Sequence, residues 1–399
     1  MRIRQKRQWL ILTLCVLCIV VGLFFISCKT FNNKETSIPK AIKHGIVYYE
    51  PGNFAGWPAN NGVWCWDNEI LVGFVQAEFE EEVKGLHTYN PSSAKNKYAR
   101  SIDGGETWLI EDAFDHGQTA WGFDNNVRKE DAVTPVPLTQ SIEDFTDPNF
   151  IITFQRHNNS DGPTHFYYSY DKGNKWIGPF SFPNLNTEGV ASRTDYLVEG
   201  KKELSAFLTV AKSNKDEGRV VLSRTTDGGV NWNIVSWIGE EHEGFDIMSS
   251  SVRLTKSELL TVIRSRTGEK QDLLTAYVSK DNGETWTKLK NPVTDTGRGG
   301  SPPALVKLED GRLALGYIYR SGYGSRVNIR FSSDNGRSWS DEIVLRSGDG
   351  ASRDVGYPRM VQRADGKLVL IYYWNNAILQ KDKPYRYIAS TIIDPNDWY

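Results

Sequence analysis

The sequence predicts an all-β protein, a six-bladed β-propeller, and three observations lead to this fold class. A motif of the form Ser/Thr-x-Asp-x-Gly-x-x-Trp occurs five times along the chain. Each copy lies in a similar succession of short strand-like segments, and a sixth unit without the motif follows the last copy. No sustained helical periodicity follows the N-terminal apolar segment. Regular repeats that each form one four-stranded sheet are typical of propellers.

The motif has the chemistry of a hairpin turn. The copies cover residues 101–108, 169–176, 225–232, 279–286 and 332–339, and their Asp residues are separated by 68, 56, 54 and 53 positions. In such a turn Asp accepts hydrogen bonds from amides, Gly takes a positive φ angle, and Trp leaves the turn to pack between sheets. Because each Asp has the same neighbours in every copy, we interpret the motif as structural, and it accounts for five of the 13 Trp residues.

The strand order can be followed most clearly in the fifth unit. Strand-like segments 303–308 and 312–319 flank the hairpin signal Glu-Asp-Gly, and segment 327–331 leads into the motif. The same order is found in residues 150–176, 204–232 and 251–286, and the last unit ends with residues 387–392. Pairing of the N- and C-terminal strands is expected to close the ring.

The N-terminus predicts export. Four basic residues in the first seven precede an apolar run over residues 9–26, so residues 1–27 are expected to be a secretory signal. The sequence Phe25-Ile-Ser-Cys28 resembles a bacterial lipobox, with Phe25 where Leu is most common, and predicts Cys28 as a lipidated first residue. The alternative is an uncleaved transmembrane anchor, because the apolar run is just long enough to span a bilayer.

Both alternatives predict a propeller held outside the cytoplasm by a membrane anchor. Residues 28–44 form a short tether and residues 45–399 the propeller. The favoured alternative is a lipoprotein of the bacterial outer membrane, the cell surface or the periplasm.

Composition excludes several classes of function. The 47 Lys and Arg residues stand against 49 Asp and Glu, and removal of the signal leaves 43 against 49, a formal charge of −6. This balance argues against a nucleic-acid partner, and 12% aromatic residues argue against disorder. Cys65 is the only thiol outside the first 28 residues and is expected to be buried and inert. The sequence has no zinc-like Cys/His cluster, so we predict no metal and no cofactor.

Positively charged residues recur at the ends of the second strands. In a propeller blade the turn formed by the repeated motif lies on one face, which we call the Asp-box face after the Asp of the motif, and the loop after the second strand lies on the opposite face. Four units carry a cation at this point, 15, 15, 17 and 14 residues before the next motif Asp: Arg156, Lys212, Arg264 and Arg320. Such a ring on an acidic domain predicts an anionic ligand, since Arg binds carboxylates in a bidentate manner. The alternative is that each residue is an ordinary solvated charge.

The repeats resemble the Asp boxes of the sialidase (neuraminidase) superfamily, over essentially the whole chain after the signal. The resemblance implies three arginines that bind a substrate carboxylate, a Tyr nucleophile assisted by Glu, and an Asp acid/base. By position, Arg264 resembles the second arginine and Arg326 the third. Tyr357, at the start of the last blade, matches the nucleophile.

The chain also departs from the family pattern. The place of the first arginine holds Gly-Trp57-Pro-Ala, and the expected Glu falls near Met248, with Asp246 as a possible substitute. The loop over residues 76–89 has no Asp, so its proton-transferring candidates are His87 and four Glu residues. Of these, His87 has the more suitable intrinsic pKa. These departures predict a protein other than an ordinary sialidase.

Four more residues of the opposite face precede first strands, namely Arg193, Asp195, Arg353 and Asp354. We expect Arg193 and Asp195 to contact substrate, Arg353 to replace the first arginine and Asp354 to polarise the Tyr357 hydroxyl. Trp57 is a candidate for stacking on a sugar ring.

The leading hypothesis is an exo-glycosidase that hydrolyses a terminal acidic sugar, either sialic acid or a unit containing uronic acid. Its partners would be an anionic glycan and the membrane that holds its lipid anchor. One alternative is a propeller that binds carbohydrate without catalysis. Another is a lyase for an acidic polysaccharide, in which Tyr and His serve as acid and base.

Overall fold

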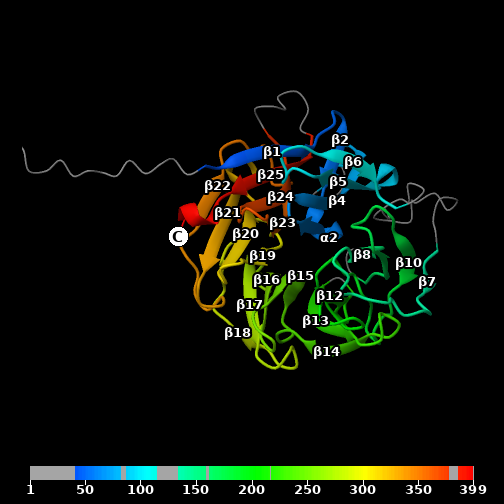
Figure 1. The fold of residues 1–399 in the computed structure, drawn as a ribbon. Coiled ribbons are helices and arrows are strands. Elements are labelled where there is room, and N and C mark those ends of the chain that lie inside the picture. The colour runs from blue at the N-terminus through cyan, green and yellow to red at the C-terminus, as the bar shows by residue number, and fades with distance from the viewer. Residues whose placement is uncertain are drawn as a thin grey trace, which may run out of the picture. The chain divides into compact units, whose positions relative to one another are not determined.

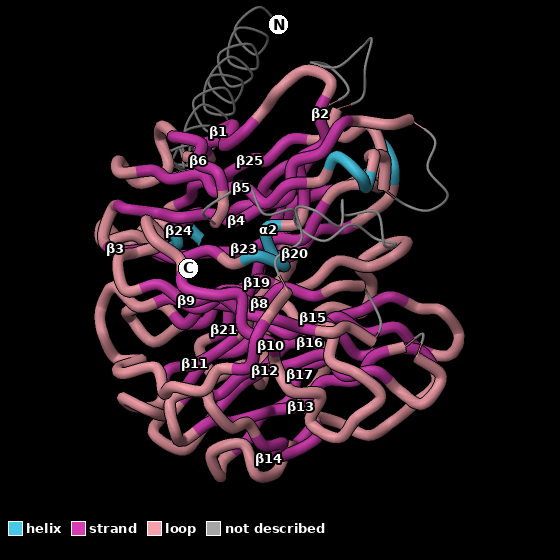
Figure 2. The backbone as a smooth tube through the Cα atoms, turned by 90° about the vertical axis from the view of Figure 1, so that its right-hand side faces the viewer, coloured by secondary structure: helices cyan, strands magenta, loops and turns pink. Residues whose placement is uncertain are grey.

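The computed structural model describes residues 41–81, 87–114, 134–158, 161–215, 217–376 and 385–398. These residues form six sheets that follow one another around a common centre (Figure 1). Figure 2 shows the strands from the side, where they run between the two faces of the ring. The predicted all-β, six-bladed propeller is therefore confirmed. The signal peptide, Cys28 and most of the tether lie outside the described residues and stay predictions.

Blade 3 follows the expected order of four strands, whereas blade 1 has five described strands and the first strand of blade 2 pairs parallel with its last strand. Blade 1 contains β2 (Asn53–Gly56), β3 (Val63–Trp66), β4 (Glu69–Glu78), β5 (Lys95–Ser101) and β6 (Leu109–Asp112). Blade 2 contains β7 (Val136–Pro137), β8 (Ile151–Arg156), β9 (Thr164–Ser169) and β10 (Ile177–Ser181). Blade 3 contains β11 (Tyr196–Val198), β12 (Leu204–Ala211), β13 (Gly218–Thr225) and β14 (Asn233–Trp237). The described helical segments of the chain are short: α2 (Pro58–Asn61) and the 3-10 turns η1 (Pro91–Ser93), η2 (Gly322–Gly324) and η3 (Pro395–Trp398).

Blades 4 to 6 complete the ring. Blade 4 contains β15 (Gly244–Arg253), β16 (Leu259–Thr267), β17 (Asp272–Ser279) and β18 (Thr287–Lys288). Blade 5 contains β19 (Ala304–Lys307), β20 (Leu313–Tyr319), β21 (Arg326–Ser332) and β22 (Ile343–Arg346). Blade 6 contains β23 (Gly356–Gln362), β24 (Leu368–Trp374), β25 (Tyr387–Ile393) and β1 (Lys43–Tyr48).

The N-terminal strand closes the ring, as predicted. Strand β1 pairs antiparallel with β25, and His44 lies opposite Thr391. The strand begins at Lys43, two residues before the expected start of the propeller at residue 45. Within the described ranges, no helix has the length and apolar character that a bilayer-crossing segment needs.

The Asp boxes are turns held by their own side chains. In the blade 4 copy, Asp281 accepts hydrogen bonds from Ser279 Oγ at 2.8 Å and from the backbone N–H of Thr285 at 2.9 Å. The Gly283 N–H donates to Ser279 Oγ at 2.8 Å. Hydrogen bonds from the Thr285 side chain and backbone lower the pKa of Asp281 to about 2. The carboxylate is thus fully used within its turn, which agrees with a structural interpretation of the motif.

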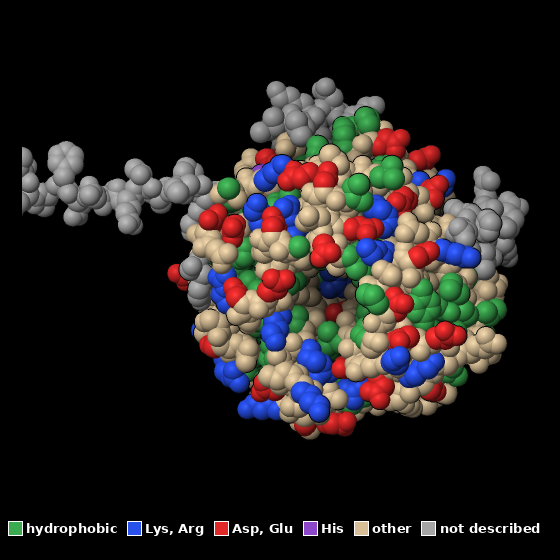
Figure 3. Space-filling view, in the orientation of Figure 1, with side chains coloured by type: hydrophobic (Ala, Val, Ile, Leu, Met, Phe, Trp, Pro, Cys, Tyr) green, Lys and Arg blue, Asp and Glu red, His purple; other side chains and the backbone are tan. Residues whose placement is uncertain are grey.

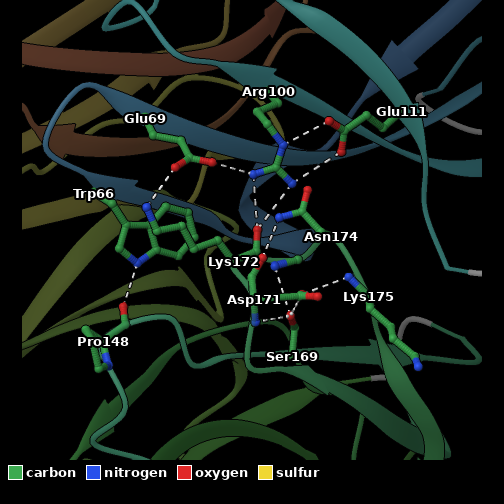
Figure 4. Close-up of polar contacts among 11 residues, drawn as sticks. Trp66, Glu69, Arg100, Glu111, Pro148, Ser169, Asp171, Lys172, Asn174 and Lys175 are labelled. Carbon is green, nitrogen blue, oxygen red and sulfur yellow. Dashed lines mark hydrogen bonds and ion pairs between the residues drawn. The ribbon is translucent and has the colours of Figure 1, made fainter.

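Each box also contacts a neighbouring blade. Figure 4 shows the blade 2 box, where Arg100 of blade 1 donates to the carbonyl of Lys172 at 3.2 Å and pairs with Glu69 at 2.7 Å and Glu111 at 2.9 Å. Lys172 reaches back to Glu69 at 2.8 Å. These ion pairs fasten the seam between blades 1 and 2 on the Asp-box face.

The tryptophans of the boxes fill the spaces between sheets. Trp176 of blade 2 stacks on Tyr98 of blade 1, with ring centres 5.2 Å apart. Trp232 of blade 3 packs against Phe182, which follows the last strand of blade 2, at 5.0 Å. Burial of such rings is worth about 2 to 3 kcal/mol each, so the aromatic content of the sequence mainly stabilises the contacts between blades.

Strand β3 is likewise structural. The indole N–H of Trp64 donates to Tyr196 Oη at 3.0 Å, and that of Trp66 donates to the Pro148 carbonyl at 2.8 Å (Figure 4). Burial raises the pKa of the Cys65 thiol to about 11. The thiol therefore stays protonated at neutral pH, which disfavours a nucleophilic role.

Replacing the box glycine Gly283 with alanine is expected to destabilise the propeller strongly. Gly283 has φ +90°, and an added Cβ would lie 2.1 Å from the buried Leu222 of blade 3. Gly311 has φ +89° with open space around it, so Gly311→Ala is a matched control for the backbone cost alone. We expect Gly283→Ala to lower the free energy of unfolding by about 1 to 3 kcal/mol more than the control does. Equal losses in urea unfolding would show that the contact with Leu222 is not tight.

Candidate active site

Tyr357 lies at the beginning of β23, the innermost strand of blade 6. Its backbone has φ +52°, a left-handed conformation that is uncommon for a bulky residue, and the β23–β24 register shifts between Gly356 and Arg359. The Tyr357 N–H donates to Ser301 Oγ at 3.3 Å. A backbone conformation of this kind costs about 1 to 3 kcal/mol and is often found at functional sites. The side chain is 8% exposed.

Arginines from four other blades surround this tyrosine, and we call them the arginine cluster. They come from the end of β8, the approach to β11, the strand β16 and the end of β20, and each is at most 8% exposed: Arg156, Arg193, Arg264 and Arg320. The positive charges of Arg264, Arg320 and Arg193 lower the pKa of the Tyr357 hydroxyl. The charge of the Tyr357 phenolate in turn raises the pKa of Arg156. Three of the four second-strand cations that the sequence singled out thus lie together.

Arg264 is in direct contact with the tyrosine. Its Nη1 lies 3.3 Å from Tyr357 Oη and 3.6 Å from the sulfur of Met248. Its Nη2 donates to the carbonyl of Gly299. The guanidinium is therefore held at one position beside the phenol.

The arginine cluster changes the protonation of Tyr357. Burial by itself raises the pKa of the phenol, but the charges of Arg264, His87 and Arg320 outweigh burial and lower the pKa to about 7. An unperturbed tyrosine has a pKa of about 10. A large fraction of the protein therefore carries a Tyr357 phenolate at neutral pH.

The arginine cluster is short of negative charge. Burial lowers the pKa of Arg156 to about 10, and burial together with the charges of Arg156 and Arg264 holds the pKa of Arg193 well below its usual range. The buried Nε atoms of Arg193 and Arg264 have no hydrogen-bond partner within the described ranges. Figure 3 shows a hollow near the centre of the ring with basic side chains inside it. An anionic ligand would supply the missing charge and acceptors.

His87 and Asp354 form an ion pair at the other side of Tyr357. His87 Nδ1 lies 2.7 Å from Asp354 Oδ1, and the imidazole ring packs edge-on toward Tyr357 with ring centres 6.3 Å apart. Burial raises the pKa of Asp354, but His87 and Arg386 outweigh burial and hold the pKa well below its usual range. A carboxylate can only accept, so Nδ1 carries a proton and Nε2 is the nitrogen that can exchange one.

The sequence did not single out two further residues of this site. Arg386 Nε donates to Asp354 Oδ2 at 3.1 Å, and Tyr373 Oη donates to Oδ1 at 2.8 Å. Tyr373 also accepts a hydrogen bond from Arg320 Nη2 at 3.1 Å. Tyr373 is near the end of a second strand and Arg386 precedes a third strand. The search for cations at the ends of second strands would have found Tyr373 if it had included uncharged residues. It would have found Arg386 if it had included the starts of third strands.

Trp57 and Met248 occupy the places where the family pattern has an arginine and a glutamate. Trp57 is 3% exposed and packs edge-on against His87 at 5.0 Å and against Tyr89 at 5.1 Å. It therefore packs behind His87 and offers no open ring to a sugar, unlike the predicted stacking platform. Met248, with φ +56°, lies in the same core cluster as Tyr357.

Other candidates lie away from Tyr357. Asp246 accepts hydrogen bonds from Ser265 and from His242. The register of β15 shifts at Met248, and Met248 is the residue that contacts Arg264. Lys212 donates to the Gly244 carbonyl at 2.7 Å and so holds the backbone at the start of β15.

Arg326 also differs from the expectation. It lies on the third strand of blade 5, where its guanidinium stacks on Tyr319 at 4.5 Å and approaches Glu342 at 3.7 Å. Arg320, at the end of the second strand, is the blade 5 arginine whose charge lowers the pKa of Tyr357.

Two of the predicted residues lie near the site in other roles. Arg353 is partly exposed, and its carbonyl accepts a hydrogen bond from Arg320 Nε at 2.9 Å. Burial and the charges of Arg298 and Arg320 lower the pKa of Arg353. Asp195 instead accepts from Ser251 Oγ at 2.9 Å and lines a separate cavity of about 290 Å³. In the part of the chain that the structure describes, no three His, Cys, Asp or Glu side chains are grouped to hold a metal ion.

Comparison with solved structures identifies the same architecture in other proteins. A protein of unknown function from Dyadobacter fermentans is 20% identical, with a TM-score of 0.65 over 90% of this chain and 100% of the other. A sialidase from Streptococcus pneumoniae is 11% identical, with a TM-score of 0.55 over 92% and 73%. An α-L-arabinanase from Penicillium chrysogenum is 16% identical, with a TM-score of 0.52 over 86% and 98%. These likenesses show a fold shared with glycoside hydrolases.

Comparison at the level of sequence gives the family. A search of the curated proteins found no match. The sequence matches the BNR repeat-like domain over residues 113–370, which is more than half of the chain and includes four of the five Asp boxes. The chain belongs to the BNR repeat-like domain family.

Proposed function

We propose that this protein is an exo-acting glycosidase that hydrolyses a terminal acidic sugar, such as a sialic acid or a uronic acid. The observation that carries the proposal is the arginine cluster itself. Four buried guanidinium groups interact electrostatically with one phenol, and two of their Nε donors have no partner among the described residues. A sugar carboxylate matches the planar fork of an arginine and would complete the charge balance.

Tyr357 would be the nucleophile. Its phenolate would attack the anomeric carbon, the glycosidic C–O bond would break, and water would later release the sugar from the tyrosine. A carboxylate nucleophile would be repelled by the substrate's own carboxylate. Because Arg264 and its neighbours already lower the phenol pKa to about 7, the reaction would not need a glutamate at the position of Met248.

His87 would transfer the proton. Its Nε2 would protonate the leaving oxygen in the first step and accept a proton from water in the second. Asp354 would be a positioning residue, because its carboxylate orients the imidazole through Nδ1 at 2.7 Å.

The rate should depend on pH through Tyr357. The reactive form is the phenolate, so kcat/KM is expected to fall about tenfold for each pH unit below the phenol pKa of about 7. Arg264→Gln should move this limb to higher pH, because Arg264 is the largest of the charges that lower the pKa. A rate that rises as the pH falls would instead assign Tyr357 a role as proton donor.

A lyase is the second candidate, and the methionine at the glutamate position favours it. Tyr357 or His87 would remove the proton beside a uronate carboxylate, the other would protonate the leaving oxygen, and the arginines would stabilise the charge that develops. Elimination adds no water and leaves a carbon–carbon double bond in the product.

Mass spectrometry of the products would separate these functions. Sialosyl and uronosyl conjugates of methylumbelliferone and acidic oligosaccharides would be incubated with wild type and with Tyr357→Phe. Products that contain one added water support hydrolysis, and unsaturated products support elimination. Binding of acidic glycans without any product would indicate a propeller that binds carbohydrate without catalysis.

We also propose that the protein is an exported lipoprotein. The lipobox-like sequence that ends at Cys28 supports this location. Incorporation of labelled palmitate into wild type but not into Cys28→Ala would test it, and equal labelling would argue against lipidation at this cysteine.

A further inference from the structure

We propose that a second carbohydrate-binding site, for neutral sugars, lies in the seam between blades 3 and 4. A cleft of about 1050 Å³ opens there, separate from the arginine cluster, and we call it the seam cleft. Its walls are the end of β14 and the following loop on one side, and β16, β17 and β18 on the other. The side chains that carry the proposal are Trp237, Glu241, Glu243 and Glu269.

One aromatic ring in the seam cleft is exposed and available for stacking. Trp237 is 41% exposed. The guanidinium of Arg219 lies 4.7 Å from its ring centre and donates to the Gly239 carbonyl, so one side of the indole is supported. Trp286, the Asp-box tryptophan of blade 4, and the buried Tyr277 belong instead to the packing between blades 3 and 4. A supported, exposed indole such as that of Trp237 suits the apolar C–H face of a pyranose.

The polar groups of the seam cleft suit hydroxyl groups. Glu240, Glu241 and Glu243 come from the loop before β15, and Glu269 comes from the turn between β16 and β17. Ionised carboxylates only accept hydrogen bonds, and sugar hydroxyls are donors. Deeper in the cleft, Ser265 contacts Thr275 Oγ1 at 2.8 Å and adds hydroxyl groups to the wall.

Charge defines which sugar can occupy the seam cleft. Four glutamates line it, and one of them, Glu241, lies 3.8 Å from Arg219. The cations of the lining are Lys288, His242 and Arg266, of which His242 and Arg266 are paired with Asp246 and Asp272. Such a lining repels a carboxylate and accepts neutral sugars, which is the opposite preference to that of the arginine cluster.

The seam cleft and the arginine cluster share strand β16. Arg264 contacts Tyr357, whereas the next residue, Ser265, lines the seam cleft, since successive side chains of a strand point to opposite sides. The inference does not rest on the proposed glycosidase activity, because binding in the cleft requires no turnover. It would let the protein hold neutral parts of a glycan apart from any acidic terminus.

Isothermal titration calorimetry would test the inference with neutral hexasaccharides built from glucose, galactose, mannose or xylose. We expect at least one of them to bind wild type, and Trp237→Ala to weaken that binding by about tenfold or more. Val344→Ala is the matched control, since Val344 also lies on a fourth strand and is also 41% exposed. Glu241→Gln tests the carboxylates with little change in shape and should weaken binding less.

The outcomes separate the two sites. Binding that is lost in Trp237→Ala and retained in Arg264→Gln supports the seam cleft, whatever the hydrolysis assays show. No binding of any neutral probe, or equal binding by Trp237→Ala and Val344→Ala, would overturn the inference. Matching thermal unfolding midpoints for the two alanine variants would exclude misfolding as the cause of a difference.

Discussion

Tyr357→Phe is expected to lower kcat by about a thousandfold or more, because the variant loses the only phenol that contacts Arg264 among the described residues. The ring remains, so its packing against Tyr373 at 5.9 Å and the fold should be preserved. Substrate binding should change little, since the arginines that would hold the carboxylate stay in place. The measurement is the initial rate on the conjugate that wild type turns over fastest.

Tyr372→Phe is the control for this variant. Tyr372 is also buried, and its hydroxyl contacts Arg346 at 3.2 Å and Thr391 at 2.7 Å, away from Tyr357. Its loss should reduce the free energy of unfolding by about 1 kcal/mol and leave kcat unchanged. Equal rates for Tyr357→Phe and wild type would remove Tyr357 from the mechanism.

Asp354→Asn is expected to lower both turnover and stability. The carboxylate accepts from His87, Arg386 and Tyr373 at 2.7 to 3.1 Å and is nearly inaccessible to solvent. Without it, the buried Arg386 loses the ion pair with Asp354 at 3.1 Å, and breaking a buried ion pair costs about 3 to 5 kcal/mol. His87 also loses its orienting partner, so kcat should fall by about a hundredfold to ten-thousandfold.

Asp349→Asn separates the two effects. Asp349 lies between β22 and β23 and pairs with Arg346 at 2.6 Å, with no contact to His87 among the described interactions. The control should lose stability but keep its kcat. If Asp354→Asn lost only stability as well, with kcat and its pH profile unchanged, His87 would not depend on Asp354 for catalysis.

The fold could be predicted because its signal is local and repeated. Each Asp box contains its own hydrogen bonds, as Ser279, Asp281 and Gly283 show, so the motif forms in the same way in every blade. Strand direction then determines which loops share a face. This reasoning brought Arg264 and Arg320 to one face, and the family resemblance added Tyr357; the structure places the three beside each other.

The finer parts of the site could not be read in this way. The bulge at Met248 has no glycine to reveal it, and it decides that Met248 and not Asp246 lies next to Arg264. Arg386 is 32 residues from Asp354 in the sequence, and the two come into contact only because the strands that follow them belong to the same sheet of blade 6. Arg326 was placed by local similarity, and its position on the third strand directs it to Tyr319 and Glu342.

The central claim is that the arginine cluster holds Tyr357 as a phenolate near neutral pH. Ultraviolet difference spectra of wild type minus Tyr357→Phe, recorded across a pH titration, measure this ionisation directly. The account predicts one tyrosinate signal with a midpoint near the pKa of about 7. A difference signal that develops only in the range of ordinary tyrosines, about pH 10, would contradict it.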